Sequence, residues 1–382
     1  MKRFGDSRAW RVGALLVGVL VMSGLAVATP QYVASNDDAA FPFLTGVSFY
    51  SVAPDGSLTF VERVQTGGYG IGGGFFGTNR LSVLDGGNQQ CVYASEASTG
   101  DIVGISVNTL TVGGSATGSP TDGGTSNGIG LAMNSQYLYA SFTDSNTIGT
   151  FQVKPGCSLA FVNDVSVGGL AGGIVNGMAI HGSILIATYT DGSIESFDIS
   201  AGAPVSHGDK QYSTATLNSQ DATYPNSIDI TSDGHYAIFG DTSTSVVVEV
   251  SDISSGKLTP TVVHTSKASI SSSNVMLSPD ETLLWVINTQ GDAVSVIYFS
   301  KTTGALSGGC TSGRLRGLSV NWSYLAGMGL ASQMGNGGGV YVAEYGTTSG
   351  VALVSLTISG QKCSLQEAKK SPFVDAGSPG LL

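Results

Sequence analysis

The sequence predicts an all-β protein, a seven-bladed β-propeller with four-stranded blades. Three observations support this prediction: a short strand motif recurs at intervals of 46 to 61 residues, glycine is abundant and charged residues are scarce. Gly accounts for 55 of 382 residues, and charged residues for 11% against about 25% in an average soluble protein. Such a chain has many tight turns and few exposed helices. Its hydrophobic fraction of 41% argues against disorder.

The first 28 residues have the three parts of a secretory signal peptide. Four basic residues within positions 2–11 precede an apolar run over residues 12–28, which ends in Ala26-Val27-Ala28. We therefore expect residues 1–28 to be a signal peptide and residues 29–382 to be one propeller domain in a secreted or periplasmic protein. An uncleaved membrane anchor is the alternative, since 17 apolar residues are at the short limit for crossing a bilayer.

The mature chain is strongly acidic. Without residues 1–28 it has 12 Lys and Arg against 26 Asp and Glu, a net charge of −14. Such a surface repels phosphate backbones and anionic lipid. We expect no nucleic-acid partner, no membrane contact beyond an uncleaved signal segment, no cofactor and a monomer.

The repeated motif is a strand in which an aromatic or aliphatic anchor precedes small residues, as in Val92–Ser95 and Leu138–Ser141. The seven anchors are Tyr32, Tyr93, Tyr139, Ile186, Ile238, Trp285 and Tyr341. Their spacing suits four-stranded propeller blades.

Each repeat has the same parts in the same order, and residues 226–258 show them most clearly. A short first strand (226–230) leads through the T-S-D-G turn (231–234) into the anchor strand. An alternating third strand (245–250) follows, and the turn 255–258 leads to the fourth strand. Gly after Asp or Ser supplies the backbone that tight hairpins need. No stretch beyond the signal has a sustained helical period, so we expect almost no helix.

The first repeat begins directly at its anchor strand, so its innermost strand is missing. Residues 378–382 resemble the start of a first strand such as 126–131. We expect the C-terminal strand to complete blade 1, which would leave no open sheet edge.

The order of motifs within each repeat resembles that of the lactonase-like and YVTN-type propeller families. An S-P-D or T-S-D-G turn is followed by an L-Y-V-A-N-like strand, then by an alternating strand, and then by D-x-x-S-G-K-L-T. The clearest copies are residues 228–261 and 278–306, and the resemblance covers essentially the whole mature chain. It implies the propeller fold. The lactonase-like family includes 6-phosphogluconolactonases and muconate-cyclising enzymes, so the resemblance also implies a lactonase-like hydrolase if the protein is an enzyme.

Asparagine stands at the entry to five first strands, close to one mouth of the expected axial channel. These residues are Asn79, Asn127, Asn176, Asn226 and Asn274. We predict that they bind a ligand; the alternative is that each amide bonds the backbone where a loop enters the crowded centre. Asn274 is one residue closer to its anchor than Asn127 and Asn226 are to theirs, which suggests a different register.

The alternate residues of these first strands mostly have small side chains, because strands that converge on an axis leave little room between them. Two are ionisable, Arg80 and Asp229, in blades 2 and 5, which could meet only across the channel. We predict Asp229 as a general base and Arg80 as the group that stabilises developing negative charge. The alternative is that channel water solvates both charges.

Carboxylates follow the anchor strands on the same face: Asp37, Asp101, Asp144, Asp191, Asp241, Asp292 and Glu344. Such a ring would suit Ca²⁺, but Asp also stabilises turns, and no spacing concentrates ligands, so we assign no metal site. The four His are expected in turns or on the surface. A Ser-His-Asp triad stays open as an alternative, although no G-x-S-x-G elbow is present.

The four cysteines predict two disulfides, Cys91–Cys157 and Cys310–Cys363. In the repeat alignment each pair joins neighbouring blades on the face opposite the Asn residues, with Cys91 at the start of a second strand and Cys310 at the start of a fourth. The other two pairings would bridge distant blades, whereas a disulfide needs Cα atoms within roughly 7 Å.

These features predict an exported propeller that binds a small molecule or a protein partner around the channel. One alternative is a hydrolase that acts on a lactone or a sugar-derived substrate. Another is a structural propeller of an envelope or extracellular assembly.

Overall fold

The computed structural model describes residues 31–37, 42–71, 80–86, 89–118, 129–213, 225–241, 248–253, 257–264, 272–288, 292–316, 324–331, 338–345, 350–360 and 362–374. Contacts divide the chain into Met1–Gln31 and Tyr32–Leu382, and the second unit is described below. The signal segment, Asn79, Asn127 and the C-terminal strand 378–382 lie outside the described residues. Within the described ranges, no helix is both long and apolar enough to cross a membrane.

The second unit consists of seven antiparallel sheets. Blade 1 comprises β1 (Tyr32–Asn36), β2 (Gly46–Val52) and β3 (Leu58–Gln65). Blade 2 comprises β4 (Leu81–Gly86), β5 (Gln89–Glu96), β6 (Asp101–Ser106) and β7 (Thr111–Thr117). Blade 3 comprises β8 (Ile129–Met133), β9 (Tyr137–Phe142), β10 (Thr147–Val153) and β11 (Leu159–Ser166). Blade 4 comprises β12 (Val175–His181), β13 (Ile184–Tyr189), β14 (Ser193–Asp198), β15 (Val205–Ser206) and β16 (Gln211–Tyr212). Blade 5 comprises β17 (Pro225–Ile230), β18 (Tyr236–Asp241), β19 (Val248–Asp252) and β20 (Thr259–His264). Blade 6 comprises β21 (Ser272–Leu277), β22 (Leu283–Asn288), β23 (Ala293–Phe299) and β24 (Leu306–Thr311). Blade 7 comprises β25 (Tyr324–Leu330), β26 (Gly339–Tyr345), β27 (Gly350–Ser359) and β28 (Lys362–Glu367).

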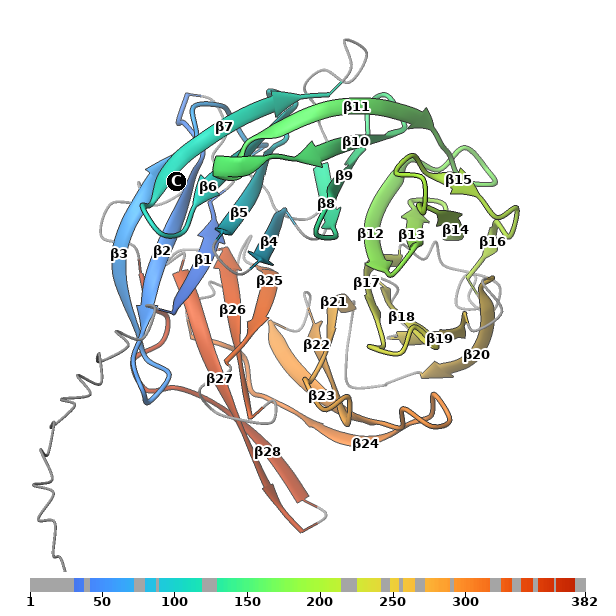
Figure 1. Cartoon of the computed structure of the whole chain (residues 1–382). Helices are drawn as coiled ribbons and strands as arrows, with labels where there is room; N and C mark the ends of the chain where they lie inside the picture. The colour runs from blue at the N-terminus through green and yellow to red at the C-terminus, as the bar shows by residue number, and fades with distance from the viewer. Residues whose placement is uncertain are drawn as a thin grey trace, which may run out of the picture. The chain divides into compact units, whose positions relative to one another are not determined.

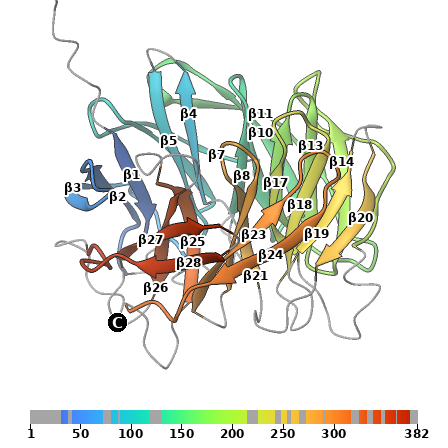
Figure 2. The ribbon, with the colours of Figure 1, turned by 90° about the horizontal axis from the view of Figure 1, so that it is seen from below.

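The blades surround a central axis, with the first strand of each complete blade innermost and the last on the rim (Figure 1). Contacts between β4, β8, β12, β17, β21 and β25 link the inner strands in that order. Figure 2 shows the strands running between the two faces. We call the face where the inner strands begin the entry face. The seven-bladed, all-β prediction is confirmed. In blades 2 to 7 each predicted anchor lies in the strand next to the innermost one, whereas Tyr32 lies in β1, the first strand described for blade 1.

Blade 1 has three described strands, in the order β1-β2-β3. The predicted fourth strand, residues 378–382, lies outside the described residues, so closure of this sheet by the C-terminus stays a prediction. Blades 7 and 1 nevertheless pack together. The hydroxyl of Tyr341 donates to the carbonyl of Gly56 at 2.8 Å, and Tyr50, Leu353 and Phe373 belong to one buried cluster at this seam.

The hydrophobic core lies between the blades and forms one cluster at each of the seven seams. Successive side chains of a strand point to opposite faces, so each anchor strand contributes to two seams. Tyr93 packs toward blade 3, whereas Val92 and Ala94 pack toward blade 1. Burial of each large side chain contributes about 1.5–3 kcal/mol. The repeated anchors are therefore the residues that join each blade to the next.

Both predicted disulfides are confirmed. Cys91–Cys157 joins blades 2 and 3 with Cα atoms 5.6 Å apart, and Cys310–Cys363 joins blades 6 and 7 at 5.8 Å. Cys157 lies in the 3₁₀ turn η1 (Pro155–Cys157), between the third and fourth strands of blade 3. One detail was wrong: Cys310 is the fifth residue of β24 rather than its first, because β24 begins four residues earlier than the repeat suggested.

Candidate functional site

The pairing of inner strands with anchor strands identifies equivalent positions around the channel. The inner-strand residues that pair with anchors are Ser82, Ala132, Ala179, Asp229, Met276 and Gly329. Among these six positions, five are small or apolar and one is a carboxylic acid. Asp229 is therefore the distinctive group at this level of the described inner strands.

The carboxylate of Asp229 crosses from blade 5 to the inner strand of blade 6. Its Oδ2 accepts a hydrogen bond from the Leu277 amide at 2.7 Å, and Oδ1 accepts one from the Ile230 amide at 2.8 Å. The next amide, that of Ser278, pairs with Leu283 of β22. Since amides of a strand alternate in direction, the Leu277 amide lies on the edge of β21 away from β22. Asp229 thus binds the free inner edge of its neighbour.

Asp229 has a perturbed acidity. Burial raises the pKa of Asp229 to about 6, while the hydrogen bonds from Leu277 and Ile230 oppose this shift and the charge of Glu281 adds to it. A carboxyl group with such a pKa exchanges its proton close to neutral pH, as acid–base catalysis requires.

Ser227 and Asn274 form a second bridge between the same two strands. The Val275 amide donates to Ser227 Oγ at 3.1 Å, and Ser227 Oγ lies 3.0 Å from Asn274 Oδ1. Because the hydroxyl already accepts the amide N–H, its own proton is directed to Asn274 Oδ1. This bond orients the amide of Asn274, which is 7% exposed, and leaves Nδ2 directed away from Ser227.

A β-bulge explains why the predicted asparagines are not all equivalent. In β17, Pro225 pairs with Asp241 and Ser227 with Gly240, so Asn226 is the extra residue. In β21, the extra residue is Ser273. Asn274 is therefore equivalent to Ser227, and the register change suggested by the sequence is real. A bulge re-aims the side chains beside it.

The other predicted asparagines differ in how far the structure describes them. Asn176 is the second residue of β12 and only 1% exposed; its carbonyl accepts a hydrogen bond from Ser141 of blade 3 at 2.9 Å. The backbone of Asn226 is described but its side chain is not. A ligand-binding role for these asparagines stays a prediction.

Arg80 lies directly before β4 and is 9% exposed. Ser82 pairs with the anchor of blade 2 as Asp229 pairs with that of blade 5, so Arg80 is equivalent to Ser227. The position of Arg80 in its inner strand thus differs from that of Asp229 by two residues, which is about 7 Å along the strand direction. The two residues also belong to blades that are not neighbours. Their joint catalytic role stays a prediction.

Several carboxylates after the anchor strands hold loops of the entry face. Asp37 forms an ion pair with Arg63 at 2.5 Å, and Asp292 one with Arg314 at 2.7 Å. Asp191 accepts hydrogen bonds from the amides of Ala171, Gly173 and Ser193. These contacts support the turn-stabilising alternative. Within the described ranges, no three His, Cys, Asp or Glu side chains converge as metal ligands.

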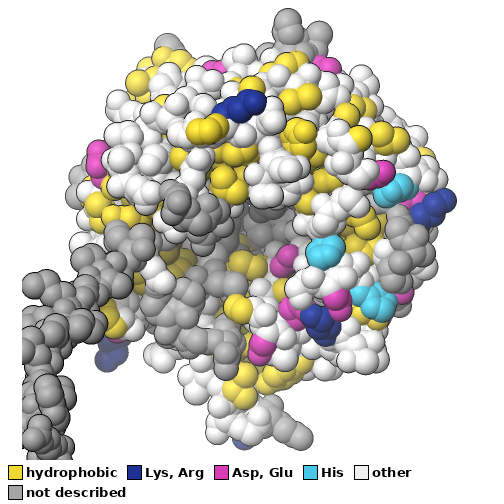
Figure 3. Space-filling model, viewed as in Figure 1, with side chains coloured by type: hydrophobic (Ala, Val, Ile, Leu, Met, Phe, Trp, Pro, Cys, Tyr) yellow, Lys and Arg dark blue, Asp and Glu magenta, His cyan; other side chains and the backbone are white. Residues whose placement is uncertain are grey.

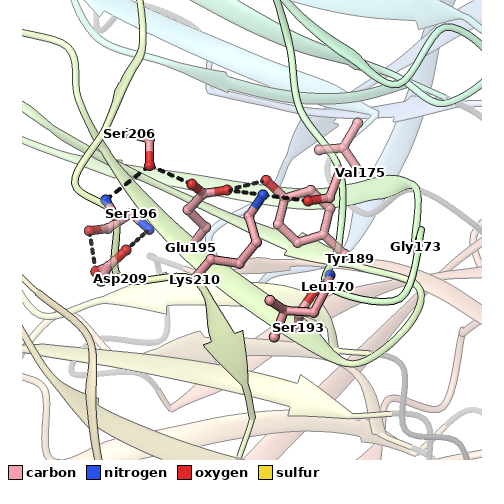
Figure 4. A network of polar contacts seen from close by, with 12 residues as sticks. Leu170, Gly173, Val175, Tyr189, Ser193, Glu195, Ser196, Ser206, Asp209 and Lys210 are labelled. Atoms are coloured by element: carbon pink, nitrogen blue, oxygen red, sulfur yellow. Dashed lines mark hydrogen bonds and ion pairs between the residues drawn. The ribbon is translucent and has the colours of Figure 1, made fainter.

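Ser196, His207 and Asp209 of blade 4 resemble a catalytic triad in composition but not in geometry; Ser196 and Asp209 are labelled in Figure 4. Ser196 Oγ donates to Asp209 Oδ2 at 2.6 Å and lies 2.9 Å from His207 Nδ1. In a triad the acid orients the histidine, whereas here it binds the serine, which is fully buried. Asp209 also accepts the Leu258 amide of blade 5. The trio therefore fastens the interrupted fourth strand, β15 and β16.

A second polar cluster of blade 4, drawn in Figure 4, was not predicted from the sequence. The buried carboxylate of Glu195 accepts hydrogen bonds from Tyr189 at 2.8 Å and Ser206 at 2.5 Å, and Lys210 lies 3.0 Å away. The signal was an acidic residue in the middle of a buried strand, residues 193–198. The members of this cluster supply the hydrogen bonds and the opposite charge that the Glu195 carboxylate needs, which explains why this charge is tolerated in a buried strand.

The face seen in Figure 3 is hollowed near its centre, and His and acidic side chains gather on one side of it. His235 stacks on Tyr236 with ring centroids 4.3 Å apart, and its Nε2 lies 3.4 Å from Asp252. The ring of His181 lies against Gly234, where a side chain would clash. His235 occupies the turn between the first two strands of blade 5, as expected from the sequence, whereas His181 is the last residue of β12, directly before the corresponding turn of blade 4.

Comparisons with known proteins agree with this architecture. A family model described as "Lactonase, 7-bladed beta-propeller" matches residues 91–322, whereas no curated protein matches the sequence. A putative 6-phosphogluconolactonase from Bacteroides fragilis superposes with a TM-score of 0.65 and 15% identity, over 89% of this chain and 94% of its own. The periplasmic gluconolactonase of Pseudomonas aeruginosa gives 0.56 and 14%, over 73% and 81%. A functionally unknown protein from Desulfotomaculum acetoxidans gives 0.60 and 15%, over 84% and 91%.

At these identities the solved structures show a shared fold alone. The family match is stronger evidence, because it covers more than half of the sequence and runs from blade 2 to the start of blade 7. This chain belongs to the lactonase family of seven-bladed β-propellers.

Proposed function

We propose that this protein binds a small, neutral, hydroxylated ligand at the channel wall between β17 and β21. The observation that carries the proposal is the orientation of Asn274 by Ser227, on the same wall as the carboxyl group of Asp229. An amide N–H donates to a hydroxyl or carbonyl oxygen, and a carboxylate accepts from a hydroxyl. Together they suit a sugar or a sugar-derived lactone.

The charge distribution supports a ligand without phosphate. Arg63, Lys210, Lys301, Arg314 and Arg316 each pair with a carboxylate. A phosphorylated sugar needs several cationic donors, and these five are already engaged. Of the two substrate classes named for the structural neighbours, a gluconolactone therefore suits this chain better than its 6-phospho form.

Hydrolysis of the bound lactone is the second candidate function, and the raised pKa of Asp229 favours it. In this reaction Asp229 takes a proton from water as the water oxygen bonds to the lactone carbonyl carbon. The ring C–O bond then breaks, the ring oxygen gains a proton, and the product is a hydroxy acid. Arg80 would stabilise the negative charge that develops on the carbonyl oxygen.

The same proposal includes export through residues 1–28. Two disulfides suit an oxidising compartment, and one structural neighbour is a periplasmic protein. A role as a purely structural propeller would need no ligand, so ligand binding separates the two.

A thermal-shift titration tests the binding proposal. Glucono-1,5-lactone or gluconate should raise the melting temperature of the full mature protein in a saturable way, and 6-phosphogluconate should not. Asn274→Ala should abolish the shift, whereas Asn108→Ala, in an exposed turn of blade 2, should keep it. An equal shift in both variants, or a preference for the phosphorylated compound, would contradict the proposal.

A further inference from the structure

Glu344 is a buried carboxyl group at the seam between blades 6 and 7. It lies in β26, three residues after the anchor Tyr341, and is 4% exposed. Neither of its oxygens has a hydrogen-bond partner among the described residues. The equivalent residue of blade 2, Glu96, accepts the Gly68 amide at 2.8 Å. Buried polar atoms are nearly always satisfied in native proteins, so the difference between these two positions calls for an explanation.

The groups that face Glu344 come from three other elements at the seam of blades 6 and 7. They are Glu367 of β28, Arg316 after β24 and Asp292 before β23. Asp292 pairs with Arg314 at 2.7 Å, and Glu367 with Arg316 at 3.2 Å. Three carboxyl groups thus share two guanidinium groups, and Glu344 is the surplus acid.

Arg316 is the residue that ties the two blades together here. Its side chain donates to the carbonyls of Lys369, at 2.9 Å, and Ala368, and its amide donates to Glu367 at 2.9 Å. A few residues later, Phe373 pairs with Val351 of β27 in both directions. Arg316 therefore holds the segment that follows the last strand of the seventh blade.

We propose that this seam is a pH-sensitive lock, which holds while Glu344 is protonated and weakens when Glu344 ionises. An ionised Glu344 would compete with Glu367 for Arg316 and would leave one uncompensated charge in a buried seam. Burial, reinforced by repulsion from Glu367 and Asp292, raises the pKa of Glu344 to about 8.

The sign of the effect follows from linkage. An unfolded Glu releases its proton near its ordinary pKa, whereas the folded protein keeps it to a higher pH. The stabilisation from protonated Glu344 is therefore complete below about pH 4, declines as the pH rises, and is lost above about pH 8. Glu344→Gln mimics the protonated form at every pH.

Melting temperatures of the wild type, Glu344→Gln and the control Glu62→Gln test the lock between about pH 5 and pH 9. Glu62 is exposed on β3, so its variant should follow the wild type. Glu344→Gln should match the wild type near the acid limit and melt a few degrees higher near the alkaline limit. A difference that does not change with pH, or a variant less stable throughout, would overturn the proposal.

Amide hydrogen exchange places the effect in the structure. Near pH 9, the amides of Ala368 and Phe373 should exchange faster in the wild type than in Glu344→Gln, with those of blade 3 unchanged; equal rates would overturn the lock. If the variant does not fold, the infrared spectrum of the wild type decides. A carboxylic-acid C=O band should persist at neutral pH and disappear above about pH 8, and its absence at neutral pH would overturn the proposal.

Discussion

The seams on the two sides of blade 6 use carboxylic acids in opposite ways. Between blades 5 and 6, Asp229 accepts two amides and Ser227 accepts a third, so a free strand edge becomes a satisfied wall. Between blades 6 and 7, Glu344 has no hydrogen-bond partner among the described residues. In the proposals above, the first arrangement positions groups toward a ligand, and the second holds a proton. The environment of a propeller carboxylate therefore depends on what the next blade presents to it.

The largest expected effect is on the proposed hydrolysis. Asp229→Asn should slow lactone opening about 10²–10⁴-fold, as loss of a general base does. Because the base must be ionised, kcat/KM of the wild type should rise through a pKa of about 6 and then level off. Progress curves at several pH values measure both. Asp164→Asn on β11 is the control, and equal rates for the two variants would remove Asp229 from the reaction.

The next largest effect is on the disulfide beside the proposed lock. Replacing Cys310 and Cys363 with Ser should lower the free energy of unfolding by about 2–4 kcal/mol, measured by denaturant titration. Adding Glu344→Gln should recover part of this loss at alkaline pH, because it removes the surplus charge. Because independent effects on stability add, no gain from Glu344→Gln at alkaline pH in this background would contradict the lock.

Ser227→Ala tests the satisfied wall. It leaves the Val275 amide without its acceptor, which should cost about 1–3 kcal/mol, and it frees the amide of Asn274 to rotate, which should weaken ligand binding. Calorimetric titration with the lactone measures the second effect. Ser183→Ala, in an exposed turn of blade 4, should leave both quantities unchanged.

The smallest effect is expected for Arg314→Ala. The Arg314 side chain is 42% exposed, and such surface ion pairs contribute about 0–1 kcal/mol. Arg316→Ala should cost more, because Arg316 also donates to two carbonyls. Denaturant titration of the two variants ranks them, and a reversed order would contradict the role of Arg316 as the residue that holds the lock.

The blades and both disulfides were predictable because they follow from the spacing of the anchors. Once Tyr93 and Trp285 are assigned to second strands, strand order fixes which cysteines lie on neighbouring blades. The bulges at Asn226 and Ser273 were not predictable, since an extra residue leaves no compositional mark. The equivalence of Asn274 with Ser227 was predictable, in contrast, because each precedes its anchor by 11 residues.

Hydrogen-bond partners that come from a neighbouring blade could not be predicted from the sequence either. Glu96 and Glu344 have the same position in their repeats, yet Glu96 accepts the Gly68 amide from the connection after β3, whereas neither oxygen of Glu344 has a hydrogen-bond partner among the described residues. The contact of Asp209 with Leu258 spans 49 residues, and no local pattern indicates it. Closure of blade 1 by residues 378–382 lies outside the described residues and stays a prediction.

The most direct test of the central claim is the side-chain amide resonance of Asn274 in a ¹⁵N-labelled protein, assigned by its loss in Asn274→Ala. Adding the non-phosphorylated lactone or its hydroxy acid should shift this resonance in a saturable way, and the shift should disappear in Ser227→Ala. A ligand that binds while the Asn274 resonance stays in place would contradict a binding site on the wall between blades 5 and 6.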